Sequence, residues 1–127
     1  MEKLVHTGLL FDFYGGLLTE KQRRTMGLYY EEDWSLAEIA EAEGVSRQAV
    51  HDLLHRTENI MEEFETKLGM VRNYLKQQNI LSQVTTKLAI MLDTVPTESE
   101  IHRELLCVKE QVEILRSSET EEEEVHQ

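Results

Sequence analysis

The chain has 127 residues, which is enough for one domain or for one domain with an appendage. With one proline and six glycines it favours helices, and it contains no apolar run of the roughly 20 residues that a membrane-spanning helix needs. Its formal net charge of −12 excludes a protein that binds nucleic acid through its surface as a whole, so any such contact must be local and basic.

Cysteine is present only once, as Cys107, so no internal disulfide can form and the chain suits a reducing compartment. No signal peptide is evident at the N-terminus, where Asp12 interrupts the apolar residues and no small-residue cleavage site follows. We therefore expect a cytoplasmic protein without a membrane span.

The N-terminal part of the chain predicts two helices. Residues 3–14 carry apolar side chains at roughly helical spacing and end at Gly15-Gly16, which stops a helix. A second helix begins at Thr19, because Thr19 and Gln22 have the spacing of a capping box, in which side chains satisfy backbone donors of the first turn. The acidic run 31–33 ends this helix as a solvated loop.

Two further helices complete a predicted N-terminal domain, residues 1–68. The third begins at Ser35, which forms a second capping box with Glu38, and it is short because Gly44 follows soon. The fourth begins at Ser46 and carries an apolar stripe for several turns. Gly69 marks its end or a bend.

The segment 36–55 has the layout of a helix-turn-helix. Ala40 is small where two steeply crossed helices approach each other, and Gly44 supplies the positive φ of the tight turn. One departure is Glu43, since an apolar residue would pack better just before the turn. The residues whose spacing turns them inward, so that they lock the two helices together, are Ile39, Val45, Val50 and Leu53.

If the helix that begins at Ser46 reads a groove, the exposed residues near its start make the contact. Arg47 can pair bidentately with guanine and Gln48 with adenine. The predicted interface comprises Ser46, Arg47, Gln48, His51 and His55, with Arg56, Lys21, Arg23 and Arg24 as possible phosphate contacts. The alternative is that Arg47 and Gln48 are only the solvated first turn of a core helix. The surrounding acids favour that alternative: Asp52, Glu38, Glu41 and Glu43.

Other chemistries find little support in the sequence. His51 and His55 have the spacing of a zinc-binding pair, but no third ligand is evident, so we predict no metal and no other cofactor. Tyr14, Tyr29 and Tyr30 are expected to pack, with their hydroxyls reaching the surface. No nucleophile with a placed base and no phosphate-binding loop stands out, so we expect a binding protein rather than an enzyme.

The C-terminal part, residues 69–117, predicts a helical hairpin. Apolar residues recur by threes and fours from Tyr74 to Val95, and a turn with the only proline follows. We expect a capping box over residues 97–100, and then a stripe of 4-3-4-3 spacing from Ile101 to Leu115.

The hairpin leaves an apolar seam that needs covering, partly by the N-terminal domain and partly by a second copy. We therefore predict a homodimer through the C-terminal helices. Residues 118–127, which include the run Glu121–Glu124, predict an acidic disordered tail.

The segment LTEKQRRTMGLYYEEDWSLAEIAEAEGVSRQAVHDLLHR resembles region 4 of bacterial sigma factors. Read in order, FDFYGGLLTEKQ, LYYEEDWSLAEIAE and VSRQAVHDLLHRTE resemble the YlxM family, small helix-turn-helix proteins of Gram-positive bacteria, over roughly residues 8–68. By this match, residues 46–50 and Asp52 fall in the family's SRQAV-x-D stretch. Region 4 of sigma factors carries more basic residues in its second helix than this chain does, which weakens promoter reading in particular.

The resemblance implies a place in the signal recognition particle pathway, because the family's gene typically lies beside that of the particle's GTPase. It implies a regulatory or assembly component whose partner is that GTPase, the particle's RNA, or both. The alternative is a transcriptional regulator that reads duplex DNA with the helix 46–66. In either case we expect an all-α fold, with a sigma region 4-like helix-turn-helix domain followed by long C-terminal helices that form an αα-hairpin.

Overall fold

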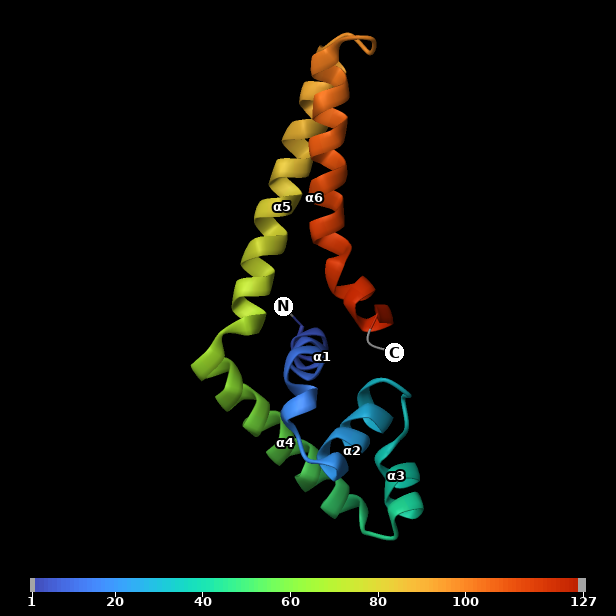
Figure 1. Ribbon diagram of the computed structural model, residues 1–127. Helices are drawn as coiled ribbons and strands as arrows, with labels where there is room; N and C mark the ends of the chain where they lie inside the picture. The colour runs from blue at the N-terminus through green and yellow to red at the C-terminus, as the bar shows by residue number, and fades with distance from the viewer. Residues whose placement is uncertain (1, 126–127) are drawn as a thin grey trace. The chain divides into compact units, whose positions relative to one another are not determined.

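The structure is a computed structural model that describes the backbone of residues 2–125 and the side chains of residues 2–117. Within residues 2–125 it is all-helical, as expected, and contains no strand (Figure 1). Its elements in chain order are α1 (Lys3–Tyr14), the short 3-10 helix η1 (Gly15–Leu17), α2 (Glu20–Tyr30), α3 (Leu36–Glu43), α4 (Arg47–Leu68), α5 (Met70–Thr94) and α6 (Glu100–Val125).

Local hydrogen bonds start α2 and α3 where the sequence predicts. The Thr19 hydroxyl accepts from the N–H of Gln22 at 3.2 Å, and the Gln22 side chain accepts from the N–H of Thr19 at 3.0 Å. Ser35 and Glu38 exchange the same two bonds, each at 3.1 Å. Both capping boxes are confirmed, and each satisfies backbone donors that the start of a helix would leave without a partner.

The start of α6 differs from the prediction, because the expected capping box over residues 97–100 does not form and Ser99 caps the helix instead. The Ser99 hydroxyl accepts from the N–H of His102 at 3.2 Å and donates to the carbonyl of Pro96 at 2.7 Å. The N–H of Ser99 also donates to the Pro96 carbonyl, at 3.0 Å. This turn after the proline moves the first helical residue to Glu100.

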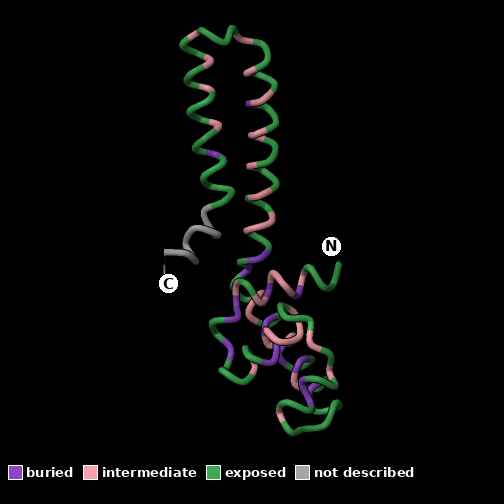
Figure 2. Tube along the Cα trace, turned by 90° about the vertical axis from the view of Figure 1, so that its right-hand side faces the viewer, coloured by how far each residue is buried: buried purple, intermediate pink, exposed green. Residues whose placement is uncertain are grey.

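The chain divides into two compact units, residues 1–73 and residues 74–127. In the first unit α4 is the central helix, because α1, α2 and α3 each pack against it. Val50, Leu54 and Met61 form its buried stripe, whereas Leu68 in its last turn is 54% exposed. Most of the buried residues lie in this unit (Figure 2).

A glycine ends α4. Gly69 has a φ of +63°, in the left-handed region where glycine carries little steric penalty, and its N–H donates to the carbonyl of Glu65 at 2.8 Å. The expected domain boundary after residue 68 coincides with this helix end. The compact unit nevertheless continues to residue 73, because hydrogen bonds hold the first turn of α5 within it.

These hydrogen bonds form what we call the α5 cap. The Tyr14 hydroxyl of α1 donates to Glu65 Oε1 at 2.6 Å and accepts from the N–H of Met70 at 3.1 Å. The Glu65 carboxylate of α4 also accepts from the N–H of Val71 at 2.9 Å and of Arg72 at 3.1 Å. The first three backbone donors of α5 are thus satisfied by side chains of two other helices.

The electrostatics of the α5 cap follow from burial and these bonds. Burial raises the pKa of Tyr14, and its bond to Glu65 adds to the rise. Burial alone would also raise the pKa of Glu65, but the hydrogen bonds from Tyr14, Val71 and Arg72 outweigh it and leave that pKa below its ordinary value. At neutral pH the cap therefore consists of a neutral phenol and a charged carboxylate.

In the second unit α5 and α6 run side by side in opposite directions and form the expected αα-hairpin (Figures 1 and 2). The polar stretch 77–79 does not interrupt α5. Leu88 on α5 and Val112 on α6 are buried. The backbone of α6 continues to Val125 and so includes most of the predicted acidic tail, residues 118–127, whose side chains lie outside the described residues.

Candidate nucleic-acid interface

The turn between α3 and α4 has the backbone that the sequence predicts. Gly44 adopts a φ of +69°, and its N–H donates to the carbonyls of Ala40 and Glu41. The Ser46 hydroxyl caps α4 by accepting from the N–H of Ala49 at 3.0 Å. The chain therefore folds back sharply at Gly44, and Ser46 is exposed at the start of the next helix.

Packing between α3 and α4 follows the prediction at three of four positions. Ile39 is fully buried, Val50 is 2% exposed and Leu53 is half-buried. The prediction for Val45 is wrong, because this side chain is 44% exposed. Val45 lies in the turn rather than on either helix, at the wall of a surface hollow described below.

The outer side of α4 exposes four predicted contact residues of its own: Arg47, Gln48, His51 and His55. Asp52 is exposed among these residues and adds a negative charge to the group. The Gln48 amide donates to Asp52 Oδ1 at 2.9 Å, and His51 Nδ1 lies 3.5 Å from the same oxygen. A base that needed the Gln48 amide would have to break this bond first.

The two histidines of α4 stack on each other rather than converge. The rings of His51 and His55 are nearly parallel, with an interplanar angle of 5° and centroids 6.3 Å apart. Within the described residues no group of three His, Cys, Asp or Glu side chains is placed to hold a metal ion. Among the residues with described side chains, the pair has no third protein ligand of the kind that a zinc site uses.

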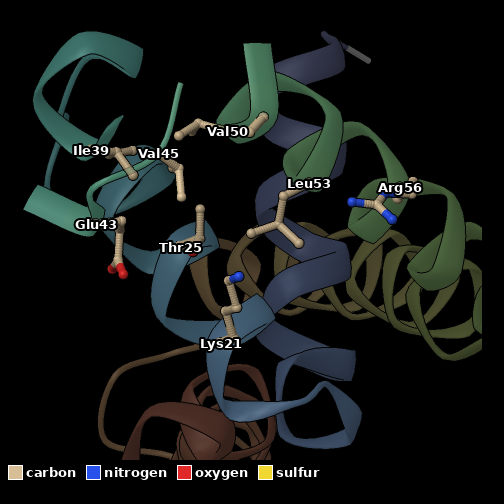
Figure 3. Close-up of a pocket in the computed structure, with 9 residues that line it drawn as sticks. Lys21, Thr25, Ile39, Glu43, Val45, Val50, Leu53 and Arg56 are labelled. Carbon is tan, nitrogen blue, oxygen red and sulfur yellow. The ribbon is translucent and has the colours of Figure 1, made fainter. Parts of the chain in front are cut away.

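Two predicted phosphate contacts, Lys21 of α2 and Arg56 of α4, line a hollow of about 120 Å³ among α2, α3 and α4. Its apolar wall includes Val45 and Leu53, and its other lining residues come from the same three helices (Figure 3). Its volume is below the roughly 150 Å³ of a cavity that holds benzene, so it has room for about one side chain. Arg56 also donates weakly to the Asp52 carbonyl, at 3.4 Å.

Arg24 and Arg23, the remaining predicted phosphate contacts, lie elsewhere. Arg24 Nη2 forms an ion pair with Glu43 Oε2 at 2.9 Å, so one predicted contact residue already has a partner on α3. This ion pair also explains why a charged residue stands at position 43, where the sequence pattern favours an apolar one: the Glu43 carboxylate pairs with Arg24. Arg23 is exposed and lines a separate hollow between α1 and α2, next to Glu31 and Glu32.

The nine predicted residues thus fall into three groups. The start of α4 brings together Ser46, Arg47, Gln48, His51 and His55, the hollow brings together Lys21 and Arg56, and Arg23 and Arg24 lie on α2 next to acids. Glu38 and Glu41 of α3 are exposed as well. The predicted interface therefore consists of a few cations with acidic residues close to them.

Sequence reasoning missed the roles of the buried tyrosines. Tyr14 is fully buried and Tyr30 half-buried, and their hydroxyls bond Glu65 and Glu58 of α4 rather than reaching solvent. Burial raises the pKa of Tyr30, and its bond to Glu58 raises it further. The only signal in the sequence is the row of acids on α4, which the hydrophobic pattern does not pair with any tyrosine.

The chain is similar in sequence to the members of one protein family. The family model described as "Putative helix-turn-helix protein, YlxM / p13 like" (UPF0122) matches residues 1–101. A UPF0122 protein of Streptococcus pneumoniae is 43% identical over 117 residues, which cover 92% of this chain and 94% of that protein. A UPF0122 protein of Halalkalibacterium halodurans is 51% identical over 84 residues, 66% of this chain and 77% of that protein. A third, from Symbiobacterium thermophilum, is 49% identical over 84 residues, 66% of this chain and 78% of that protein.

No helix in the described part of the chain combines the length and the apolar character that crossing a membrane requires. The all-α architecture, the turn at Gly44 and the match over residues 1–101 agree with one another. The chain therefore belongs to the UPF0122 family of YlxM / p13-like helix-turn-helix proteins.

Proposed function

We propose that this protein is a non-enzymatic helix-turn-helix binding protein that acts in the cytoplasm as a regulatory or assembly component of the signal recognition particle pathway. Its ligand in this proposal is the particle's RNA, its GTPase, or both. The observation that carries the proposal is the start of α4, where Arg47 is exposed while Val50, three residues later, is buried and fixes the helix against the unit. The pathway is the one that the resemblance to the YlxM family implies.

The hydrogen bonds that the buried titratable groups make support a binding role rather than a catalytic one. Tyr14 and Glu65 satisfy the backbone donors of α5, and Tyr30 bonds Glu58. Each of these groups is engaged in holding helices together.

The charge pattern supports a ligand that is not a continuous duplex. Asp52 lies among the exposed residues of α4 and holds the Gln48 amide, and Glu38 and Glu41 add negative charge on α3. A duplex would bring phosphates close to these acids. The same acids also repel the phosphates of RNA, so this pattern favours a ligand that needs only local contacts, such as those from Arg47, Lys21 and Arg56.

The alternative is a transcriptional regulator that reads duplex DNA with α4. The observation that favours it is the geometry of the N-terminal turn of α4, where Ser46 caps the helix and Arg47 projects in its first turn, as in helices that enter the major groove. In that case Arg47 contacts a guanine edge, and Gln48 has to leave Asp52 to reach an adenine.

Mobility shift assays across a salt series separate the two. The probes are the particle RNA and a panel of duplex DNA. A shift with RNA alone, weakening steeply with salt, supports the first proposal and eliminates DNA reading. Replacing Arg47 and Gln48 by Ala should weaken the shift about tenfold and leave the melting temperature unchanged, since both side chains are exposed.

Arg103→Ala is the matched control, because it removes one exposed cation from α6, outside the helix-turn-helix. It should leave the shift as in the unmodified protein. If neither nucleic acid shifts, titration calorimetry with the purified GTPase tests the protein arm of the proposal. No heat with the GTPase and no shift with RNA would together refute a role in this pathway.

The working form in this proposal is a homodimer that pairs through α5 and α6. Support comes from apolar side chains that the hairpin leaves exposed within the described residues, such as Ile80, Ile101 and Val108. Sedimentation of the full chain at micromolar concentration tests it, and a monomer would refute it.

A further inference from the structure

Exposed apolar side chains on α6 follow a seven-residue interval. Ile101 is 61% and Val108 40% exposed, while Leu105 is half-buried and Val112 is 9% exposed. Seven residues make nearly two full turns, so Ile101 and Val108 share one side of the helix. The apolar stripe of α6 is therefore wider than the part of it that α5 covers.

Helix α5 carries a matching strip. Ile80 and Met91 are each 48% exposed and lie eleven residues apart, which is close to three full turns. Leu88, by contrast, is 7% exposed and marks the side of α5 that is turned inward. Ile80 and Met91 lie roughly 60–80° from Leu88 around the helix, at 100° per residue.

The two strips lie on the same face of the hairpin. On α6, the side turned toward α5 is centred between Leu105 and Lys109. Viewed along each helix from its N-terminus, Ile101 and Val108 are rotated away from this side in the same sense as Ile80 and Met91 are from Leu88. Two antiparallel helices are exchanged by a twofold axis perpendicular to the face of the hairpin. An equal sense of rotation on both helices therefore leads to one face, which we call the apolar hairpin face.

The residues of the two strips alternate along this face. Because α5 ends at Thr94 and α6 begins at Glu100, residues equally far from the turn lie at the same level. Met91 is then placed at a level between Ile101 and Val108. Side chains that alternate in this way form the ridges and holes into which another helical surface packs.

Opposite charges line the two edges of the apolar hairpin face. Lys76 and Lys87, both exposed, lie along the outer edge of α5. Glu100 and Glu104, also exposed, lie along the outer edge of α6. One edge of the face is thus basic and the other acidic, as in the flanking positions of coiled coils that set partner and orientation.

We propose that two copies of this chain pack through the apolar hairpin face into a four-helix bundle in which the hairpins run parallel, with α5 of one copy on α6 of the other. This inference rests on the dimer proposed above and adds its face and its direction. The charged edges decide the direction. Parallel hairpins set the basic edge of each copy against the acidic edge of its partner, so that Lys87 approaches the partner's Glu104. The opposite arrangement would set like charges together.

The first experiment tests the face, by sedimentation and light scattering on the full chain at micromolar concentration. The unmodified protein should be a dimer, and the variant carrying Ile101→Glu and Val108→Glu should be a monomer with unchanged helicity by circular dichroism. Ile114→Glu is the control, because Ile114 is 58% exposed on the same helix but points away from the face, so this variant should remain a dimer. A monomeric unmodified protein would overturn the proposal. So would a dimer that Ile114→Glu disrupts and the double variant does not.

The second experiment tests the direction, in a background where Cys107→Ser removes the native thiol. Lys87→Cys and Glu104→Cys are made separately and mixed under mild oxidation. Parallel hairpins predict disulfide-linked dimers from the mixture and few from either variant alone. Efficient cross-linking of each variant with itself would overturn the parallel arrangement while leaving the dimer standing.

Charge reversal gives a readout that needs no cross-link. Lys87→Glu should weaken dimerisation about tenfold at low salt, since it places like charges at two symmetric positions. Adding Glu104→Lys should restore most of the affinity. Loss of affinity without this rescue would also overturn the parallel arrangement. None of these three experiments depends on the nucleic-acid ligand, so a failure here is separate from a failure of the binding proposal.

Discussion

Glu65→Gln is the substitution that most directly tests the α5 cap. The carboxylate accepts three hydrogen bonds, from the Tyr14 hydroxyl and from the N–H groups of Val71 and Arg72. Glutamine keeps the size of the side chain and one acceptor oxygen, but it loses the charge and presents an amide donor to other donors. With hydrogen bonds to charged groups contributing about 1.5–3 kcal/mol each, and one acceptor retained, we expect a loss of about 2–3 kcal/mol in the free energy of unfolding.

Urea unfolding followed by tryptophan fluorescence measures this loss. The only tryptophan, Trp34, lies in the first unit, so its emission reports on the unit that contains the cap. Glu63→Gln is the control, because Glu63 is exposed on the same helix, and it should change stability by less than about 0.5 kcal/mol. If Glu65→Gln cost no more than this control, the cap would not stabilise the unit and the reasoning would be refuted.

The same variant predicts a difference in acid. Because the pKa of Glu65 is lower in the folded protein than its ordinary value of 4.5, its charged form stabilises the fold above that pH. This stabilisation is lost as pH falls from 4.5 through the lower folded pKa. Glu65→Gln lacks this contribution, so its stability should fall less steeply over this window than that of the unmodified protein. Parallel curves would contradict the assignment.

Three other substitutions address the helix-turn-helix. Asp52→Asn removes the anion that holds Gln48, and it should raise affinity for RNA or duplex DNA roughly three- to tenfold in low-salt mobility shifts, with the gain shrinking as salt rises. Gly44→Ala should cost about 1 kcal/mol in chemical unfolding, since a side chain is strained at a φ of +69° although the added carbon meets no described atom within 4 Å. Arg24→Ala should cost less than about 1 kcal/mol by the same measurement, because the Arg24 and Glu43 side chains are 55% and 22% exposed, and a larger loss would show that the pair holds α2 on α3.

The features that the sequence predicts well are those fixed by neighbours along the chain. The two capping boxes depend on residues three apart, Thr19 with Gln22 and Ser35 with Glu38, and both form. The turn at Gly44 depends on one glycine between two short apolar patterns. Such signals often hold because the atoms concerned lie within a single helical turn. The box expected over residues 97–100 fails because the turn after Pro96 makes Ser99 the cap instead.

The features that the sequence did not predict depend on how helices cross. Arg24 meets Glu43 across 19 positions and Tyr14 meets Glu65 across 51. Helical periodicity tells which side of a helix is buried but not which residue of another helix lies opposite. For this reason the sequence assigns exposed cations to an interface by charge alone, and it assigns Arg24 there although Arg24 has a partner within the fold.

Helix α4 both carries the candidate interface at its start and supports α1, α2 and α3 along its length. By thermodynamic linkage, a ligand that binds only the folded form of this helix must shift the melting of the whole first unit. The gain reaches about 2.7 kcal/mol when free ligand is a hundred times its dissociation constant. A thermal scan of the intrinsic emission of Trp34 therefore ranks candidate ligands of any chemical class on one scale, without a label on either partner.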